Sequence, residues 1–125
     1  MIRILKLILV FVSLFLIKVN IRSTSLQKVL NNINQPPFFL ELLNINSKNT
    51  LISFANVMYE KKIFSCLECA IFIKKILFKN KGAKLFIGVS VYEQEFRSHA
   101  WLEENNQIVF GQLRKLDNYK KILEI

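Results

Sequence analysis

The sequence has few of the residues that hold metals and few acidic ones. Its 125 residues include two cysteines and one histidine, whereas a structural zinc site needs four ligands, so we expect neither a metal nor a cofactor. Nine acidic residues stand against 18 basic ones, and the net charge of +9 favours anionic partners. The lysines come as scattered pairs without the interleaved aromatic residues of stacking platforms, so nucleic acid is not an expected partner.

The N-terminal segment lacks an uncharged run long enough to identify it as a membrane span. Eleven uncharged residues lie between Lys6 and Lys18, whereas a membrane span needs about 20. The run has the length of a signal-peptide core, but small residues suited to cleavage come late, at 23–25. Residues 4–17 therefore have three interpretations, of which we favour a core helix over a membrane anchor or a signal sequence.

Internal repeats and low-complexity tracts are also absent, and the 52% hydrophobic content is enough for a core. We predict one domain over residues 1–125, mainly helical at 1–62, with a further helix and a small sheet at 63–125. Apolar spacing and proline positions predict helices at 25–35 and 51–61, and a short one after Pro37. Helices followed by strands indicate an α+β fold with an antiparallel sheet.

The second half carries the strand signals. Apolar and alternating patterns predict strands at 84–91 and 99–104, with a loop at 92–98 between them. Asn105-Asn106 predicts a two-residue hairpin turn, because asparagine tolerates positive φ, and the chain returns at 107–110. A last helix is predicted at 117–123.

Ser65-Cys66-Leu67-Glu68 fits a capping box, in which Ser65 and Glu68 bond each other's backbone N–H groups. This places Cys66 at the first helical position, where the helix dipole stabilises a thiolate and favours a nucleophile. An unreactive buried cysteine is the commoner case, and we expect Cys69, one turn later, to be one. A Cys66–Cys69 redox pair is a further option, although the strand that should precede it is missing.

His99 is the one histidine, and we expect it to begin a strand. A cysteine at a helix start and a histidine at a strand start form the pair that activated-thiol chemistry uses. If the hairpin turn has two residues, His99 faces Gln112, whose amide oxygen would orient the imidazole. A one-residue bulge would instead bring up Gly111, which has no side chain, and Asp117 is a more distant candidate.

A longer pattern resembles the transglutaminase-like leader peptidases of lasso-peptide biosynthesis, the microcin-processing protein C-terminal domain family. The matching residues follow one another in the family's order: Cys66-Leu67, Gly82, Ile87-Gly88-Val89, His99-Ala100-Trp101 and Glu103. The resemblance implies a papain-like core in which Cys66 attacks the amide between leader and core peptide and His99 transfers the proton. The family usually has an aspartate on the strand after the histidine, and this chain offers Gln112 there as the third member.

The resemblance also implies partners and a location. Such peptidases commonly receive the leader from a separate recognition protein, and this chain has no spare segment for that task. We therefore expect a precursor peptide and a recognition protein as partners, with the cyclase as a further candidate. A bacterial, cytoplasmic enzyme is implied, with peripheral membrane contact through residues 4–17 as an added option. The alternative function is a small membrane-associated interaction protein without enzymatic activity.

Overall fold

The computed structural model describes residues 2–33, 35, 48–77, 82–92, 94–113 and 116–125. The helices come first: α1 (Ile2–Ser23), α2 (Leu26–Asn31), α4 (Lys48–Glu60) and α5 (Cys66–Ile76). The rest comprises β1 (Ala83–Tyr92), β2 (Glu95–Glu104), β3 (Gln107–Phe110), the 3₁₀ turn η1 (Leu116–Asn118) and β4 (Lys120–Glu124). The strands form one antiparallel sheet in the order β3-β2-β1-β4, which confirms the predicted α+β fold.

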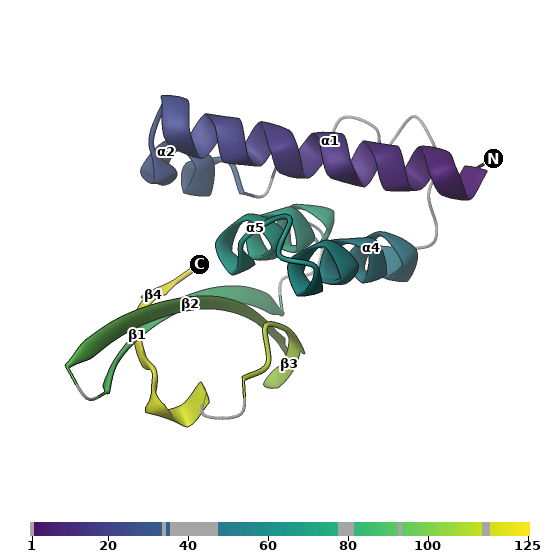
Figure 1. Cartoon of the computed structure of the whole chain (residues 1–125). Coiled ribbons are helices and arrows are strands. Elements are labelled where there is room, and N and C mark those ends of the chain that lie inside the picture. Colours follow the sequence, from purple (N-terminus) through teal and green to yellow (C-terminus); the bar gives the residue numbers. More distant parts are fainter. Residues whose placement is uncertain (1, 34, 36–47, 78–81, 93, 114–115) are drawn as a thin grey trace.

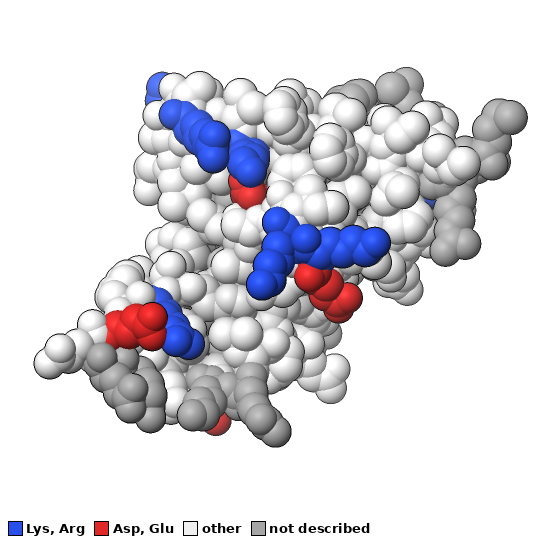
Figure 2. Space-filling view, in the orientation of Figure 1, with Lys and Arg blue, Asp and Glu red and all other residues white. Residues whose placement is uncertain are grey.

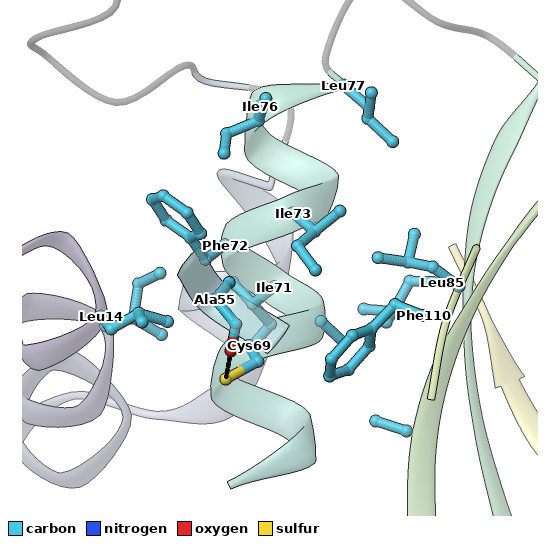
Figure 3. Packing of buried hydrophobic residues seen from close by; sticks show 14 of the residues in the cluster. Leu14, Ala55, Cys69, Ile71, Phe72, Ile73, Ile76, Leu77, Leu85 and Phe110 are labelled. Atoms are coloured by element: carbon cyan, nitrogen blue, oxygen red, sulfur yellow. Dashed lines mark hydrogen bonds between the residues drawn. The ribbon is translucent and has the colours of Figure 1, made fainter. Parts of the chain in front are cut away.

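The elements lie in layers, with α4 and α5 between α1 and the sheet (Figure 1). Helix α5 is enclosed, because Cys69 to Ile73 are fully buried and leave no polar face for water. Figure 3 shows Phe72 pointing towards Leu14 of α1, while Ile73 points towards the sheet residue Leu85. This packing holds the first turn of α5 against the sheet, where the candidate site lies.

Helix α1 buries one stripe and leaves the rest of its apolar surface exposed. Val10, Leu14 and Ile17 are buried at i, i+4 and i+7, the spacing of one helix face. Large exposed side chains cover the remainder: Ile4, Leu5, Leu7, Ile8, Phe11, Val12, Phe15, Leu16 and Val19. The stretch Ile4–Ser23 is apolar and long enough to cross a membrane, as core helices and signal sequences also can be. The core-helix interpretation therefore accounts for one stripe of α1 only.

Two predicted elements are wrong. The loop expected at 92–98 is mostly strand, because β2 begins at Glu95 and pairs its exposed first half with β1, as in Arg97 opposite Ser90. The helix expected at 117–123 is the turn η1 followed by β4, because the free edge of β1 takes up the last residues as a strand. The short helix expected after Pro37 lies outside the described residues.

The other predicted elements are confirmed, although α1 extends six residues beyond the predicted end at 17 and α2 ends four residues before the predicted end at 35. The turn at Asn105-Asn106 has φ angles of 53° and 67°, as a two-residue hairpin turn requires. The strand at 107–110 and the start of α5 at Cys66 agree with the sequence to the residue.

Candidate active site

The first turn of α5 carries the predicted capping box. The Ser65 N–H donates to Glu68 Oε1 at 2.8 Å, and the Glu68 N–H donates to Ser65 Oγ at 3.2 Å. Cys66 therefore occupies the first helical position, where unpaired N–H groups and the positive end of the helix dipole lie.

The structure places the Cys66 thiol beside the His99 imidazole, close enough for each group to shift the pKa of the other. Burial alone would raise the pKa of the Cys66 thiol. The hydrogen bond with His99, the backbone N–H groups of Ala100 and Leu67 and the charge of the imidazolium outweigh burial, so the pKa of Cys66 is lowered from 9.0. The thiol is thus placed to ionise more readily than an ordinary cysteine.

The other side of the imidazole faces the chain beyond β3. His99 Nε2 lies 2.6 Å from the backbone carbonyl oxygen of Gly111. A carbonyl only accepts, so Nε2 carries a proton, which leaves Nδ1 to receive the thiol proton. Burial lowers the pKa of His99, but the hydrogen bonds with Cys66 and with the Gly111 carbonyl outweigh it, and the pKa is raised above 6.5.

The predicted register that placed His99 opposite Gln112 is wrong. Strands β2 and β3 pair as predicted at the turn, but a bulge shifts the ladder so that Leu102 faces Phe110. The Gln112 side chain is exposed, and its amide donates to the Leu113 carbonyl. The acceptor at His99 is therefore a main-chain oxygen, a kind of partner that a search for polar side chains overlooks.

Gly111 needs to be glycine for this arrangement. Its φ is +86°, and a Cβ atom there would lie 2.8 Å from the Trp101 Cβ and 2.9 Å from the Ala100 carbonyl oxygen. The sequence signal for this positive φ was the position of Gly111, which is one of only three glycines in the chain and directly follows a predicted strand.

Aromatic rings hold the imidazole from the outer face of the sheet. Trp101 stacks on His99, with ring centroids 6.2 Å apart, and Phe86 stacks on Trp101 at 5.7 Å. Trp101 Nε1 donates to Glu103 Oε2 at 2.9 Å, which fixes the indole in its plane. Tyr119, from the segment wrongly predicted as helix, packs against His99 at 6.0 Å, whereas the candidate Asp117 is exposed on η1.

The sequence profile of the transglutaminase-like superfamily matches residues 45–124, a stretch that includes α4, α5 and the whole sheet. The chain belongs to the transglutaminase-like superfamily. Comparison with curated proteins gives no match, and comparison with solved structures gives none either. The superfamily commonly contains enzymes of the cysteine-protease type, and a cysteine at a helix start beside a histidine on the sheet fits that type.

The second cysteine of this transglutaminase-like chain has a different environment. Cys69 is fully buried, and its thiol donates to the Ala55 carbonyl at 3.6 Å (Figure 3). Burial, together with the nearby charges of Glu68 and Cys66, raises the pKa of Cys69 to about 12. Both cysteines are free thiols, and at neutral pH they differ in their tendency to ionise.

This difference predicts selective alkylation. Iodoacetamide at pH 7 is expected to modify Cys66 rapidly and to modify Cys69 far more slowly in the native protein, because only the thiolate reacts. The rate at Cys66 should rise as pH passes through its lowered pKa, below 9.0. Intact-mass and peptide mapping measure both sites.

The matched variant is His99→Ala, which removes the hydrogen bond and the positive charge while burial of Cys66 remains. Its rate–pH profile should move to higher pH, with slower labelling at pH 7. Equal labelling of Cys66 and Cys69 in the native wild-type protein would contradict the assignment.

Proposed function

We propose that this chain is a cysteine peptidase that removes the leader peptide from a ribosomally made lasso-peptide precursor. The observation that supports it most directly is the juxtaposition of Cys66 and His99, which lowers the pKa of the thiol, with the Gly111 carbonyl as the third member in place of the Gln112 amide. The motif order from Cys66 to Gly111, which resembles the leader peptidases, supports the choice of substrate.

In the proposed first step, His99 Nδ1 takes the proton of Cys66, and the thiolate attacks the carbonyl carbon of the leader–core amide. The charge on the tetrahedral oxygen faces the start of α5, where the Cys66 N–H is not used by any of the described hydrogen bonds. The imidazolium then gives its proton to the leaving nitrogen, the C–N bond breaks, and the core peptide departs with a free amine.

In the second step, water attacks the thioester that joins the leader to Cys66. His99 takes a proton from the water, and the carbonyl re-forms as the sulfur leaves and is reprotonated. The leader departs with a free carboxylate. Neither step needs a metal or a redox partner, and the Gly111 carbonyl keeps the same His99 nitrogen turned towards the sulfur throughout.

Incubation of the purified protein with candidate precursor peptides, with and without a separate recognition protein, tests the proposal. Mass spectrometry should show a leader and a core peptide whose masses sum to that of the precursor plus one water. Intact precursor under all conditions, with a recognition protein present and Cys66 reactive, would contradict the choice of substrate.

We further propose that the exposed side of α1 binds to an anionic lipid surface. Ile8 and Phe15 are each 52% exposed on that side, and Lys18 and Arg22 follow near the end of the helix. An apolar helix face next to basic residues is typical of binding in the plane of a membrane interface. This would keep the peptidase in the cytoplasm and at the membrane.

The matching prediction uses flotation with vesicles that contain phosphatidylglycerol. Wild-type protein should float with the vesicles, and the double variant Ile8→Glu, Phe15→Glu should stay below, because two buried charges oppose insertion. Val57→Glu, at an exposed apolar position on α4, is the control and should float. Flotation of the double variant as complete as that of wild type would contradict the proposal.

A further inference from the structure

A basic pocket of about 460 Å³ lies next to the candidate nucleophile and has no role in the chemistry described above. Three elements contribute its lining: the second half of α1, the end of α4 with the following turn, and the start of α5. Its lining residues are Lys18, Ile21, Arg22, Tyr59, Lys62, Phe64, Ser65 and Glu68. Figure 2 shows lysine and arginine side chains gathered over the helical layers on one face of the molecule.

The charge of the pocket is positive. Lys18, Arg22 and Lys62 line it, and none of the ion pairs between described residues involves them. Its one carboxylate, on Glu68, is buried and accepts the Ser65 N–H of the capping box. The first turn of α5 adds the positive end of its dipole. A carboxylate is the chemical group that these surroundings favour.

The pocket borders the site directly. Ser65, which lines the pocket, immediately precedes Cys66. Tyr59 also lines it, and burial, together with the nearby charge of Cys66, raises the pKa of its hydroxyl. A peptide advances about 3.3–3.6 Å per residue when extended. A residue one to three positions from the scissile bond can therefore reach the pocket.

The position of His99 decides which side of the substrate this is. The imidazole protonates the leaving nitrogen, so the core peptide extends past His99 on the sheet side. The acyl part of the substrate, which is the leader, lies on the side of the sulfur away from the sheet. The pocket lies on that side too, because residues of the helices and of the turn before α5 line it and no strand residue does. The leader side of the substrate thus faces the basic pocket.

We infer that this pocket binds an acidic side chain of the leader, one to three residues before the scissile bond. The inference rests on the proposed function, because it assumes acyl transfer to Cys66. Ile21, Tyr59 and Phe64 pack on the methylene groups of the bound side chain, while Lys18, Arg22 and Lys62 neutralise its carboxylate. Lys62 has a φ of 60°, a conformation in which glycine is normally preferred, so its side chain is held there at some conformational cost.

The test uses peptide chloromethyl ketones, which alkylate Cys66 from the acyl side. A glutamate is placed at each of the three positions before the ketone in an otherwise all-alanine probe, and each probe is matched by its glutamine twin. At one position the glutamate probe should react roughly three to ten times faster, since partly exposed ion pairs contribute modestly. Half-molar salt should reduce the preference.

The decisive variant is Lys62→Gly, which removes a charge and suits the backbone at this position, so the fold is retained. In the double variant Lys62→Gly, Arg22→Gln, the ratio of the glutamate rate to the glutamine rate should fall towards one. The control is Lys28→Gln, which changes a lysine away from this pocket and should keep the preference. Equal rates for every glutamate and glutamine pair, or an unchanged preference in the double variant, would overturn the inference. Iodoacetamide separates the two failures: a Cys66 inert to it refutes the proposed function, and a reactive Cys66 without preference refutes the pocket alone.

Discussion

Replacing Cys66 with alanine, or His99 with alanine, is expected to lower the rate of leader removal roughly 10⁴-fold, because each residue supplies a bond-making or proton-transfer step that the other cannot replace. The double variant should be no slower than either single one, since the two residues act as a unit. The measurement is the time course of core-peptide release, followed by mass.

The same variants should retain the fold. Cys66 is only partly buried and contributes one sulfur atom, so circular dichroism and the melting temperature of Cys66→Ala should stay close to those of wild type. Cys69→Ala is the matched control: it removes a buried thiol bonded to Ala55, lowers stability, and leaves the rate of cleavage nearly unchanged. Full processing by a folded Cys66→Ala protein would refute the peptidase mechanism.

The pH dependence of the cleavage rate follows from the directions in which the pKa values of Cys66 and His99 are shifted. The active pair is thiolate and imidazolium, so activity is lost as pH falls through the lowered pKa of Cys66. It is lost again as pH rises through the raised pKa of His99. A bell-shaped profile of the rate of core-peptide release against pH is therefore expected, and its two limbs belong to the coupled pair.

Gly111→Ala is expected to destabilise the protein by about 2–4 kcal/mol and to slow cleavage by a further factor of roughly 10–100. The added Cβ would meet Trp101 and the Ala100 carbonyl, and the φ of +86° is strained for alanine. Both effects move the Gly111 carbonyl away from His99 Nε2. The pKa of His99 should then fall, since that hydrogen bond holds it up.

NMR titration measures this pKa without assignment, because the chain has one histidine. Gln112→Ala is the control: its side chain is exposed and bonds the Leu113 carbonyl, so stability, rate and the pKa of His99 should all stay near wild type. A tenfold loss of activity in Gln112→Ala would restore the amide as the partner of the imidazole. An unchanged pKa of His99 in a folded Gly111→Ala protein would contradict the role of the carbonyl.

Sequence reasoning succeeded where the determining interactions are local. The capping box at Ser65 and Glu68 and the turn at Asn105-Asn106 depend on residues at most three positions apart, so their residue types predict them directly. The meeting of Cys66 with His99, 33 residues later, came from the expectation of paired chemistry and the motif order, since no local pattern specifies it.

The failures all depend on how the strands pair with one another. Every residue of β4 is exposed, so it shows no alternation of buried and exposed side chains, and only the open edge of β1 makes it a strand. The bulge between Leu102 and Glu103 leaves no mark in residue type, yet it shifts the register and exchanges the Gln112 amide for the Gly111 carbonyl. Tyr119 reaches His99 for the same reason, through the path that the chain takes between β3 and β4.

Cys69 also provides a built-in measure of local opening. Its sulfur is sealed between α5 and α4, so a labelling reagent reaches it only when these helices separate. The labelling rate, divided by that of an unstructured thiol, gives the free energy of this separation, as amide hydrogen exchange does for backbone groups. The labelling rate of Cys69 thus measures the stability of the packing between α4 and α5 without an introduced probe. The measurement can be made while a covalent blocking group occupies Cys66.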